Sequence, residues 1–263
     1  MSRRIKEDFD DLCDFFKKYS LASIFEEKDF VKQISTCHKK YYSYLVLVIE
    51  LKEIVNNANY APCMSQEQYN YVLESCSDVG QALFLVTHGC YKGAKLLLRS
   101  SIENFIKAVC FDECPNIVIK KSVYEVFDIA KASITFSGSK KNIFDTIHTE
   151  YIELCKDVHT ADFTHMEHIT ALRLFPHFNN DGAENIKRHL LRILPVYITL
   201  LCLKYNQRFH NIFYSNQEII KESILTEYKK EIQLLYLQPI ITQYFIDNKS
   251  EIWLLFLIAH SKR

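Results

Sequence analysis

The chain has 263 residues, and its 32 lysines and arginines are balanced by 32 aspartates and glutamates, so its formal net charge is zero. Such a balance gives no overall field that would draw the protein to nucleic acid or to a membrane surface. Five glycines and five prolines are present, far below the usual ~7% and ~5% of residues. This scarcity argues against turn-rich sandwiches and barrels, Gly-rich phosphate loops and doubly wound sheets, and it leaves long helices.

Hydrophobic spacing and capping residues predict the elements of the first half of the chain. Apolar residues three, four and seven positions apart predict helices over about residues 4–19 and 29–57. Ser65 and Gln68 have the spacing of a capping box, in which a hydroxyl and an amide bond each other's backbone N–H groups. They predict the start of a helix that continues to about residue 87. The next helix is expected over about 91–111.

The second half of the chain follows the same pattern. We expect a capping box at Ser122–Glu125, a helix over about 140–158 and a histidine-containing loop over 159–183. A helix over about 184–206, kinked at Pro195, should follow. A third cap at Ser215–Glu218 predicts the start of a helix that continues to about 236, and an apolar helix is expected near 250–260. No linker divides the chain. The prediction is therefore an all-α fold, a single helical bundle of about 8–10 helices. Residues 1–60 would be an N-terminal helical extension of a bundle formed by residues 61–263, in one continuous domain.

The nine cysteines are odd in number and irregularly spaced, and most of them lie among apolar residues at helical spacing. That pattern predicts reduced, buried thiols in a cytoplasmic protein rather than a disulfide framework. The first eight residues contain no apolar signal-peptide core. The longest uncharged apolar run, residues 193–203, is too short for a membrane helix of about 20 residues. We therefore expect a cytoplasmic protein with no membrane partner.

The segment from Tyr91 to Val109 carries the most informative pattern. One of its helical faces is apolar and another consists of small residues, which is typical of a helix packed from several directions. Along one edge, charged residues recur every four positions: Lys95, Arg99, Glu103 and Lys107. Arg99 and Glu103 are one turn apart and can pair directly. Such a pair is either a structural feature of the bundle or part of a functional site.

Two stretches resemble the HEPN-like helical-bundle superfamily, in its abortive-infection and toxin-type branch. Ala94–Glu103 is similar to the family's A-x-x-L-x-R-S-x-x-E helix. Tyr151–His159 is similar to its Y-x-x-L-S-x-x-V-H helix end, with Cys155 in place of the usual small hydroxyl residue. The resemblance covers about residues 65–210. It implies a helical bundle that forms a homodimer, a role in antiviral defence or toxin–antitoxin systems, action on RNA, and a polar pocket formed by Arg99, Glu103 and His159.

The catalytic pattern of active family members is not matched. They carry an arginine, four to six further residues and then a histidine, but no histidine lies within that reach of Arg99. Arg173 is followed by His177 after only three residues. Ribonuclease activity therefore does not carry over with the resemblance and stays open. No cofactor is expected.

Histidines and an aspartate recur every three residues after the 140–158 helix. His159, Asp162, His165 and His168 would form a slowly drifting row if this stretch were helical. Imidazoles and carboxylates in such a row could hold a divalent metal, although no known metal-binding motif is present. The alternatives are a polar loop, or a general base or phosphate contact at His159 beside Arg99.

From Asn185 to Gln217 the chain contains no acidic residue. Basic side chains in this stretch include Lys187, Arg188, Arg192 and Arg208, and five aromatic residues are interleaved with them. Basic residues among aromatics suit contact with an RNA backbone and stacking of its bases. The alternative is that the aromatics belong to the core and the charges lie on a solvated face.

Three hypotheses for function follow from these patterns. The first is a HEPN-like effector of a prokaryotic antiviral system that acts on RNA, with Arg99, Glu103 and His159 at its site. The second is a non-catalytic helical module of the same group that binds a protein partner encoded nearby or senses an infection signal. The third is a metal-dependent hydrolase that uses the segment from His159 to His168.

Overall fold

The computed structural model describes residues 3–159, 166, 169 and 171–235. Within that part of the chain the fold is all-α, and no strand is present. The predicted all-α class is confirmed. The helices of the first half are α1 (Arg3–Lys18), α2 (Ala22–Phe25), α3 (Lys28–Leu51), α4 (Gln66–Thr87) and α5 (Tyr91–Cys110). Those of the second half are α6 (Val123–Ala132), α7 (Lys141–His159), α8 (Asn180–Lys204), α9 (Asn206–His210) and α10 (Tyr214–Lys221). Short 3₁₀ turns join several of them.

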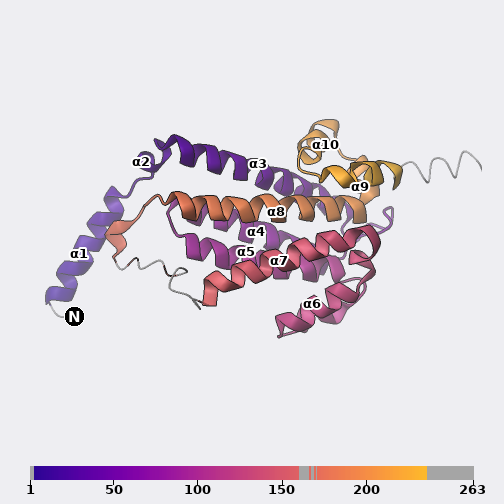
Figure 1. Cartoon of the computed structure of the whole chain (residues 1–263), viewed down its shortest axis with the longest axis horizontal. Coiled ribbons are helices and arrows are strands. Elements are labelled where there is room, and N and C mark those ends of the chain that lie inside the picture. Colours follow the sequence, from indigo (N-terminus) through magenta and orange to yellow (C-terminus); the bar gives the residue numbers. More distant parts are fainter. Residues whose placement is uncertain (1–2, 160–165, 167–168, 170, 236–263) are drawn as a thin grey trace, which may run out of the picture.

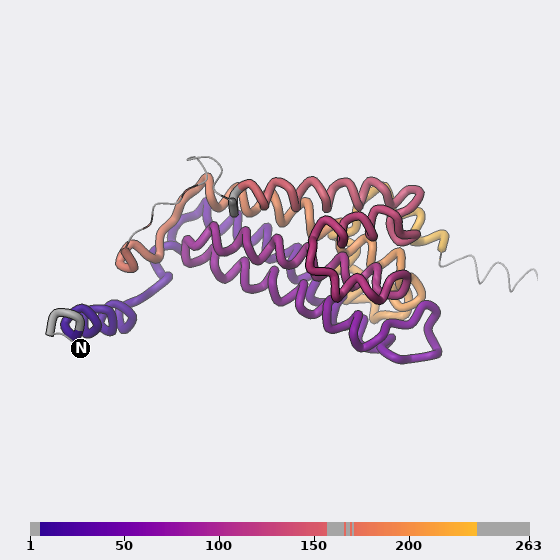
Figure 2. Tube along the Cα trace, turned by 90° about the horizontal axis from the view of Figure 1, so that it is seen from below, coloured from indigo at the N-terminus to yellow at the C-terminus, as the bar shows by residue number. Residues whose placement is uncertain are grey.

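The five long helices run side by side along the long axis of the molecule (Figure 1). α5 packs against α4, α7 and α8, and α3 packs against α4 and α8. α6, α9 and α10 lie at one end, whereas α1 projects from the other end in both views (Figures 1 and 2). α3, expected within an N-terminal extension of residues 1–60, thus belongs to the bundle. α2 packs against α3 and buries Ile24 in the core, whereas α1 projects away from the long helices.

Aromatic stacking and small residues hold the long helices together. The ring of Phe105 on α5 stacks on Tyr197 of α8, with centroids 3.8 Å apart and planes inclined by 9°. Tyr44 on α3 donates a hydrogen bond to Ser75 on α4, and Ser75 is 3.1 Å from Ser101 on α5. Hydroxyls as small as these let three helices approach closely while their polar atoms stay paired. The small face predicted for α5 is therefore its contact with α4.

Capping follows the sequence at one predicted position and departs from it at two. At Ser65, the hydroxyl accepts from the backbone of Gln68 and the Gln68 side chain accepts from the backbone of Ser65, as predicted. Ser122 makes no such bond, and Glu125 pairs with Lys120 at 2.8 Å instead. α10 begins at Tyr214, one residue before the expected cap, and ends at Lys221 rather than near 236. Residues 229–235 form a separate helical segment.

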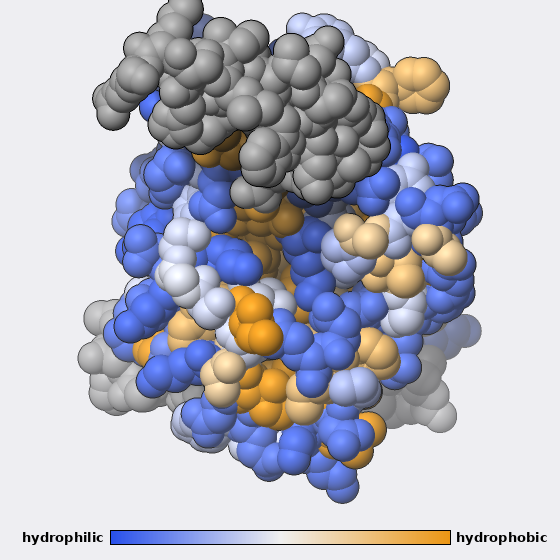
Figure 3. All heavy atoms as spheres, turned by 90° about the vertical axis from the view of Figure 1, so that its right-hand side faces the viewer, coloured by the Kyte–Doolittle hydropathy of each residue, from blue (hydrophilic) through white to orange (hydrophobic). Residues whose placement is uncertain are grey.

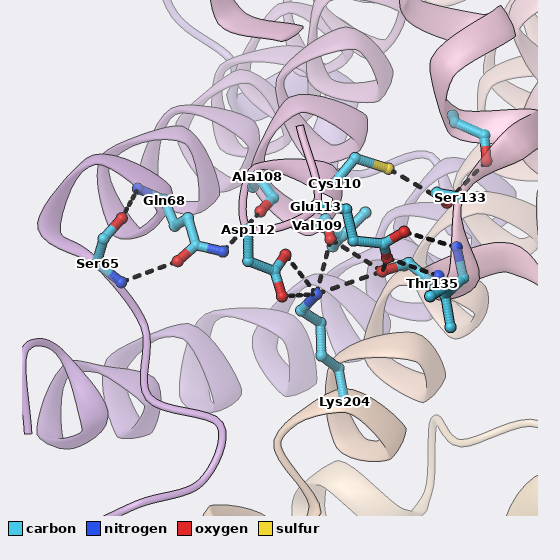
Figure 4. A network of polar contacts seen from close by, with 12 residues as sticks. Ser65, Gln68, Ala108, Val109, Cys110, Asp112, Glu113, Ser133, Thr135 and Lys204 are labelled. Atoms are coloured by element: carbon cyan, nitrogen blue, oxygen red, sulfur yellow. Dashed lines mark hydrogen bonds and ion pairs between the residues drawn. The ribbon is translucent and has the colours of Figure 1, made fainter. Parts of the chain in front are cut away.

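A polar network fixes the end of α5 (Figure 4). The Lys204 ammonium donates to the carbonyl of Val109 at 2.9 Å and to both carboxylate oxygens of Asp112, at 2.7 and 2.9 Å. Glu113 accepts from the backbone N–H groups of Ile134 and Thr135 at 2.6 and 2.7 Å. A lysine at a helix C-terminus satisfies carbonyls that the helix leaves open and complements its dipole. α5, α8 and the turn before α7 are joined at this point.

Glu113 makes stability depend on pH. Burial alone would raise the pKa of its carboxyl, but hydrogen bonds from Thr135 and Ile134 outweigh burial and hold the pKa below its usual value. A depressed folded-state pKa stabilises the protein above the unfolded-state pKa, and that contribution is lost as the pH falls through the folded-state pKa. We expect Glu113→Gln to be less stable than wild type at neutral pH in urea denaturation, with the difference shrinking once the pH drops below about 4.5. The exposed Glu26→Gln is the control and should show no such convergence.

Three of the cysteine thiols are buried and unreactive. Burial raises the pKa of Cys37, Cys76 and Cys110 to about 12. These thiols therefore stay protonated and poorly nucleophilic at neutral pH.

Among the residues that the structure describes, no helix combines the length and the apolar character needed to cross a membrane.

Candidate functional site

Arg99, Glu103 and Tyr151 form a polar triad between α5 and α7. The Arg99 Nε lies 3.4 Å from the Glu103 Oε1, so the predicted ion pair is present. The same Nε donates a hydrogen bond to the Tyr151 hydroxyl at 3.0 Å, and that hydroxyl donates to Glu103 Oε1 at 2.9 Å. Each member thus contacts the other two. The helical spacing brings the first pair together, and the packing of α7 on α5 adds the tyrosine.

The triad lies at the edge of the bundle rather than in a dry core. The side chains of Arg99 and Glu103 are 25% and 24% exposed. The Arg99 guanidinium carbon is 5.4 Å from the centre of the Tyr151 ring. Phe127 of α6 packs against the Tyr151 ring, with the two ring centres 4.8 Å apart. Aromatic packing therefore orients the guanidinium and leaves part of it in contact with solvent.

The charge states of the triad follow from its contacts. Burial raises the pKa of Tyr151 well above its usual value, and the hydrogen bond to Glu103 raises it further. Burial by itself would lower the pKa of Arg99, but the hydrogen bond and proximity to Tyr151 outweigh it, and the pKa is raised. At neutral pH the tyrosine is a neutral hydroxyl and the arginine is a cation. Tyr151 therefore cannot act as a general base here.

The two terminal nitrogens of Arg99, Nη1 and Nη2, indicate which kind of ligand the site can bind. Its hydrogen bond and its closest approach to Glu103 both use Nε, and among the described residues no hydrogen bond involves Nη1 or Nη2. A guanidinium held by one nitrogen can offer its other donors to an anion, and carboxylates and phosphates match its fork. The partly exposed Arg99 is therefore suited to binding an anion from solvent.

His159 remains a predicted member of the site. It is the last residue of α7, eight positions beyond Tyr151, which corresponds to about 12 Å along a helix axis. Its side chain lies outside the described part of the chain. Asp162, His165 and His168 lie outside it as well. Within the described residues, no group of three or more His, Cys, Asp or Glu side chains could hold a metal ion.

The basic residues predicted to contact RNA have different surroundings. Lys187 pairs with Glu184 at 2.7 Å and is 25% exposed. Arg188 is exposed, and no ion pair or hydrogen bond of its side chain is found among the described residues. Of the remaining two arginines, Arg192 pairs with a buried carboxylate and Arg208 with one that is 12% exposed.

Arg192 contacts a carboxylate inside the bundle. Its Nη1 lies 2.9 Å from Oε1 of Glu150, as an ion pair without hydrogen-bond geometry, and half of the Arg192 side chain is exposed. The other oxygen of Glu150 is 2.6 Å from Nδ1 of His189, and both of these side chains are only 1% exposed. Arg192 is therefore the solvent-side member of a buried polar cluster.

Arg208 is enclosed in the structure. Its side chain is 8% exposed, it pairs with Glu50, and it lies 2.8 Å from a carboxylate oxygen of Glu53. Its Nε donates to the backbone carbonyl of Glu50 at 2.9 Å. These contacts join α9 to the end of α3. They occupy the guanidinium that the sequence suggested for RNA.

Three residues of these polar groups were not among the site residues predicted from the sequence: Tyr151, Glu150 and His189. Tyr151 had a weak signal, since it belongs to the second family-like stretch. His189 lies in the acid-free stretch 185–217 without an assigned role, and Glu150 had no signal, because it falls in no motif and is 39 positions from His189. No family model, curated protein or solved structure matches the chain.

Proposed function

We propose that the protein is a HEPN-like effector of a prokaryotic antiviral-defence or toxin–antitoxin system that binds RNA through Arg99. The observation that carries this proposal is the partly engaged guanidinium: Nε is held by Tyr151 and Glu103, while the side chain keeps a quarter of its surface exposed. An oriented arginine of this kind suits a phosphate of the RNA backbone.

Exposed Arg188 extends the proposed surface. α7 packs against both α5 and α8, so Arg99 on α5 and Arg188 on α8 flank the same helix. Two cations on either side of one helix could contact separate phosphates of a single strand. The zero net charge of the chain means that affinity would depend on these few contacts rather than on a general field.

Arg99 and Arg188 account for binding, and cleavage is not assigned. Removing a proton from a ribose hydroxyl needs a base within hydrogen-bond reach. Tyr151 remains protonated because its pKa is raised, and the side chain of His159 lies outside the described part of the chain.

We expect Arg99→Met to weaken binding of a single-stranded RNA oligonucleotide by about ten- to a hundred-fold, because a charge-assisted contact contributes about 1.5–3 kcal/mol. The slope of log affinity against log salt should become shallower by about 0.7 for each phosphate that the variant no longer neutralises. Fluorescence anisotropy at several salt concentrations measures both. Arg173→Met removes an exposed arginine outside the triad and is the matched control.

Equal RNA affinity of wild type and Arg99→Met, with both folded, would show that the triad is structural. A non-catalytic module that binds a protein partner, or a second copy as a homodimer, would then be the better proposal. One observation favours that second candidate: α1 projects from the bundle with Phe9 and Phe16 more than half exposed. In that case Phe9→Ser/Phe16→Ser should abolish growth inhibition or phage protection in cells, while Arg99→Met should preserve it.

A further inference from the structure

A cavity of about 690 Å³ opens at the end of the bundle formed by α9, α10 and residues 229–235. Its apolar floor consists of Phe209, Ile224 and Ile232, each less than a tenth exposed. Figure 3 views the molecule from this end and shows hydrophobic atoms, in orange, at several places among hydrophilic ones. The volume is in the range of sites that enclose a drug-sized molecule, and so it could take several large side chains.

Of the lysines and glutamates that line the cavity, three take part in ion pairs, and Lys229 lines it as well. Lys221 pairs with Glu218 at 2.9 Å, and Glu222 pairs with Lys39 of α3 at 2.6 Å. An ionic ligand would have to compete with these ion pairs for their charged groups. An apolar ligand on the floor of the cavity would meet no such competition. The cavity therefore favours an apolar occupant.

The chain also carries an apolar segment further along the sequence. Ile232 and Gln233 line the cavity, and the described part of the chain ends two residues later, at Leu235. The sequence beyond it includes the uninterrupted apolar run from Ile252 to Ile258, with Trp253, two leucines and a phenylalanine in succession. Seven apolar residues are too few to span a bilayer as a helix. Exposing them to water is unfavourable, so they need an apolar surface to cover them.

We propose that the apolar run Ile252–Ile258 binds in the cavity lined by Phe209, Ile224 and Ile232 of the same chain. Residues 236–251 connect the two, and sixteen residues span about 24 Å as a helix and over 50 Å when extended. Because the connection starts at the cavity, it must turn back on itself for the run to reach the floor, and sixteen residues are enough for such a turn. Tethering on the same chain also gives the run a millimolar effective concentration, which favours it over a second copy at low protein concentration. Binding of the run in the cavity does not depend on binding of RNA.

The single tryptophan of the chain, Trp253, lies within this run and reports on its environment. In the full chain, we expect Trp253 to emit at the short wavelength of a buried indole and to resist quenching by acrylamide. Ile232→Gln in the cavity and Leu255→Gln in the run should each shift the emission to longer wavelength, raise quenching several-fold and increase binding of the dye ANS. Ile134→Gln is the matched control: Ile134 is 74% exposed and lies outside the cavity. It should leave all three signals unchanged.

Circular dichroism and thermal melting identify variants that have merely unfolded. If Ile232→Gln fails to fold, Ile224→Ser serves as the second cavity variant and is read by the same emission, quenching and ANS signals. Long-wavelength emission in the wild-type chain would overturn the proposal. So would buried emission that no cavity variant alters, since the run would then be covered elsewhere. Emission that moves to longer wavelength on dilution would show instead that a second copy covers it.

Discussion

Replacing Arg208 with methionine is expected to lower the free energy of unfolding by about 3–5 kcal/mol. The guanidinium is 8% exposed and pairs with the Glu50 carboxylate, which is itself only 12% exposed. Methionine fills much of the same space but leaves that carboxylate charged and almost buried, with the Asn216 amide at 2.7 Å as its remaining side-chain partner. An uncompensated buried charge costs more than the intact pair contributes, because desolvation is no longer offset.

Urea denaturation measures this change, and two further variants test the cause. The double variant Arg208→Met/Glu50→Gln also removes the charge of the Glu50 carboxylate and should recover much of the lost stability. Lys187→Met removes a cation whose partner Glu184 is half exposed, and it should cost less than about 1 kcal/mol. If Arg208→Met were as mild as Lys187→Met, the Arg208 guanidinium would be available to solvent. An RNA contact at that residue would then regain support.

The helices could be predicted because their signals are local. The apolar spacing of α4 and α5 and the capping box at Ser65 depend on residues within a few positions of each other. Capping failed where ion pairs with nearby lysines use the glutamate of the predicted box. Glu125 pairs with Lys120, and Glu218 pairs with Lys221.

The candidate site, too, could be predicted only where it depends on residues close together in the sequence. The Arg99–Glu103 pair follows from a spacing of one turn, so the sequence alone indicated it. The third member, Tyr151, depends on how α7 packs against α5, and no periodicity encodes that register. The absence of acidic residues between positions 185 and 217 suggested free cations. However, the carboxylates that pair with Arg192 and Arg208 come from α7 and α3, outside that window.

Arg192→Met should lower the free energy of unfolding by about 3 kcal/mol, at the low end of the range for breaking a buried pair because Arg192 is half exposed. Its partner Glu150 is 1% exposed and would keep only His189 as a neighbouring polar group among the described residues. Arg188→Met is the matched control on the same helix. Since the Arg188 side chain is exposed, that variant should change stability by no more than about 0.5 kcal/mol.

Chemical denaturation and RNA binding measured on the same variants distinguish a structural arginine from a binding one. Under the proposed function, Arg188→Met weakens RNA binding at unchanged stability. Arg192→Met loses stability, and Glu150→Gln in the same chain restores it by removing the buried charge. If the restored double variant binds RNA as tightly as wild type, Arg192 serves only to neutralise Glu150. If it binds more weakly, the exposed half of the guanidinium also contacts RNA, and the RNA surface extends along α8 by one further turn. If Arg192→Met were as stable as Arg188→Met, this prediction would be wrong. The Glu150 carboxylate would then tolerate the loss of its cation, which is not expected of a buried carboxylate in contact with His189.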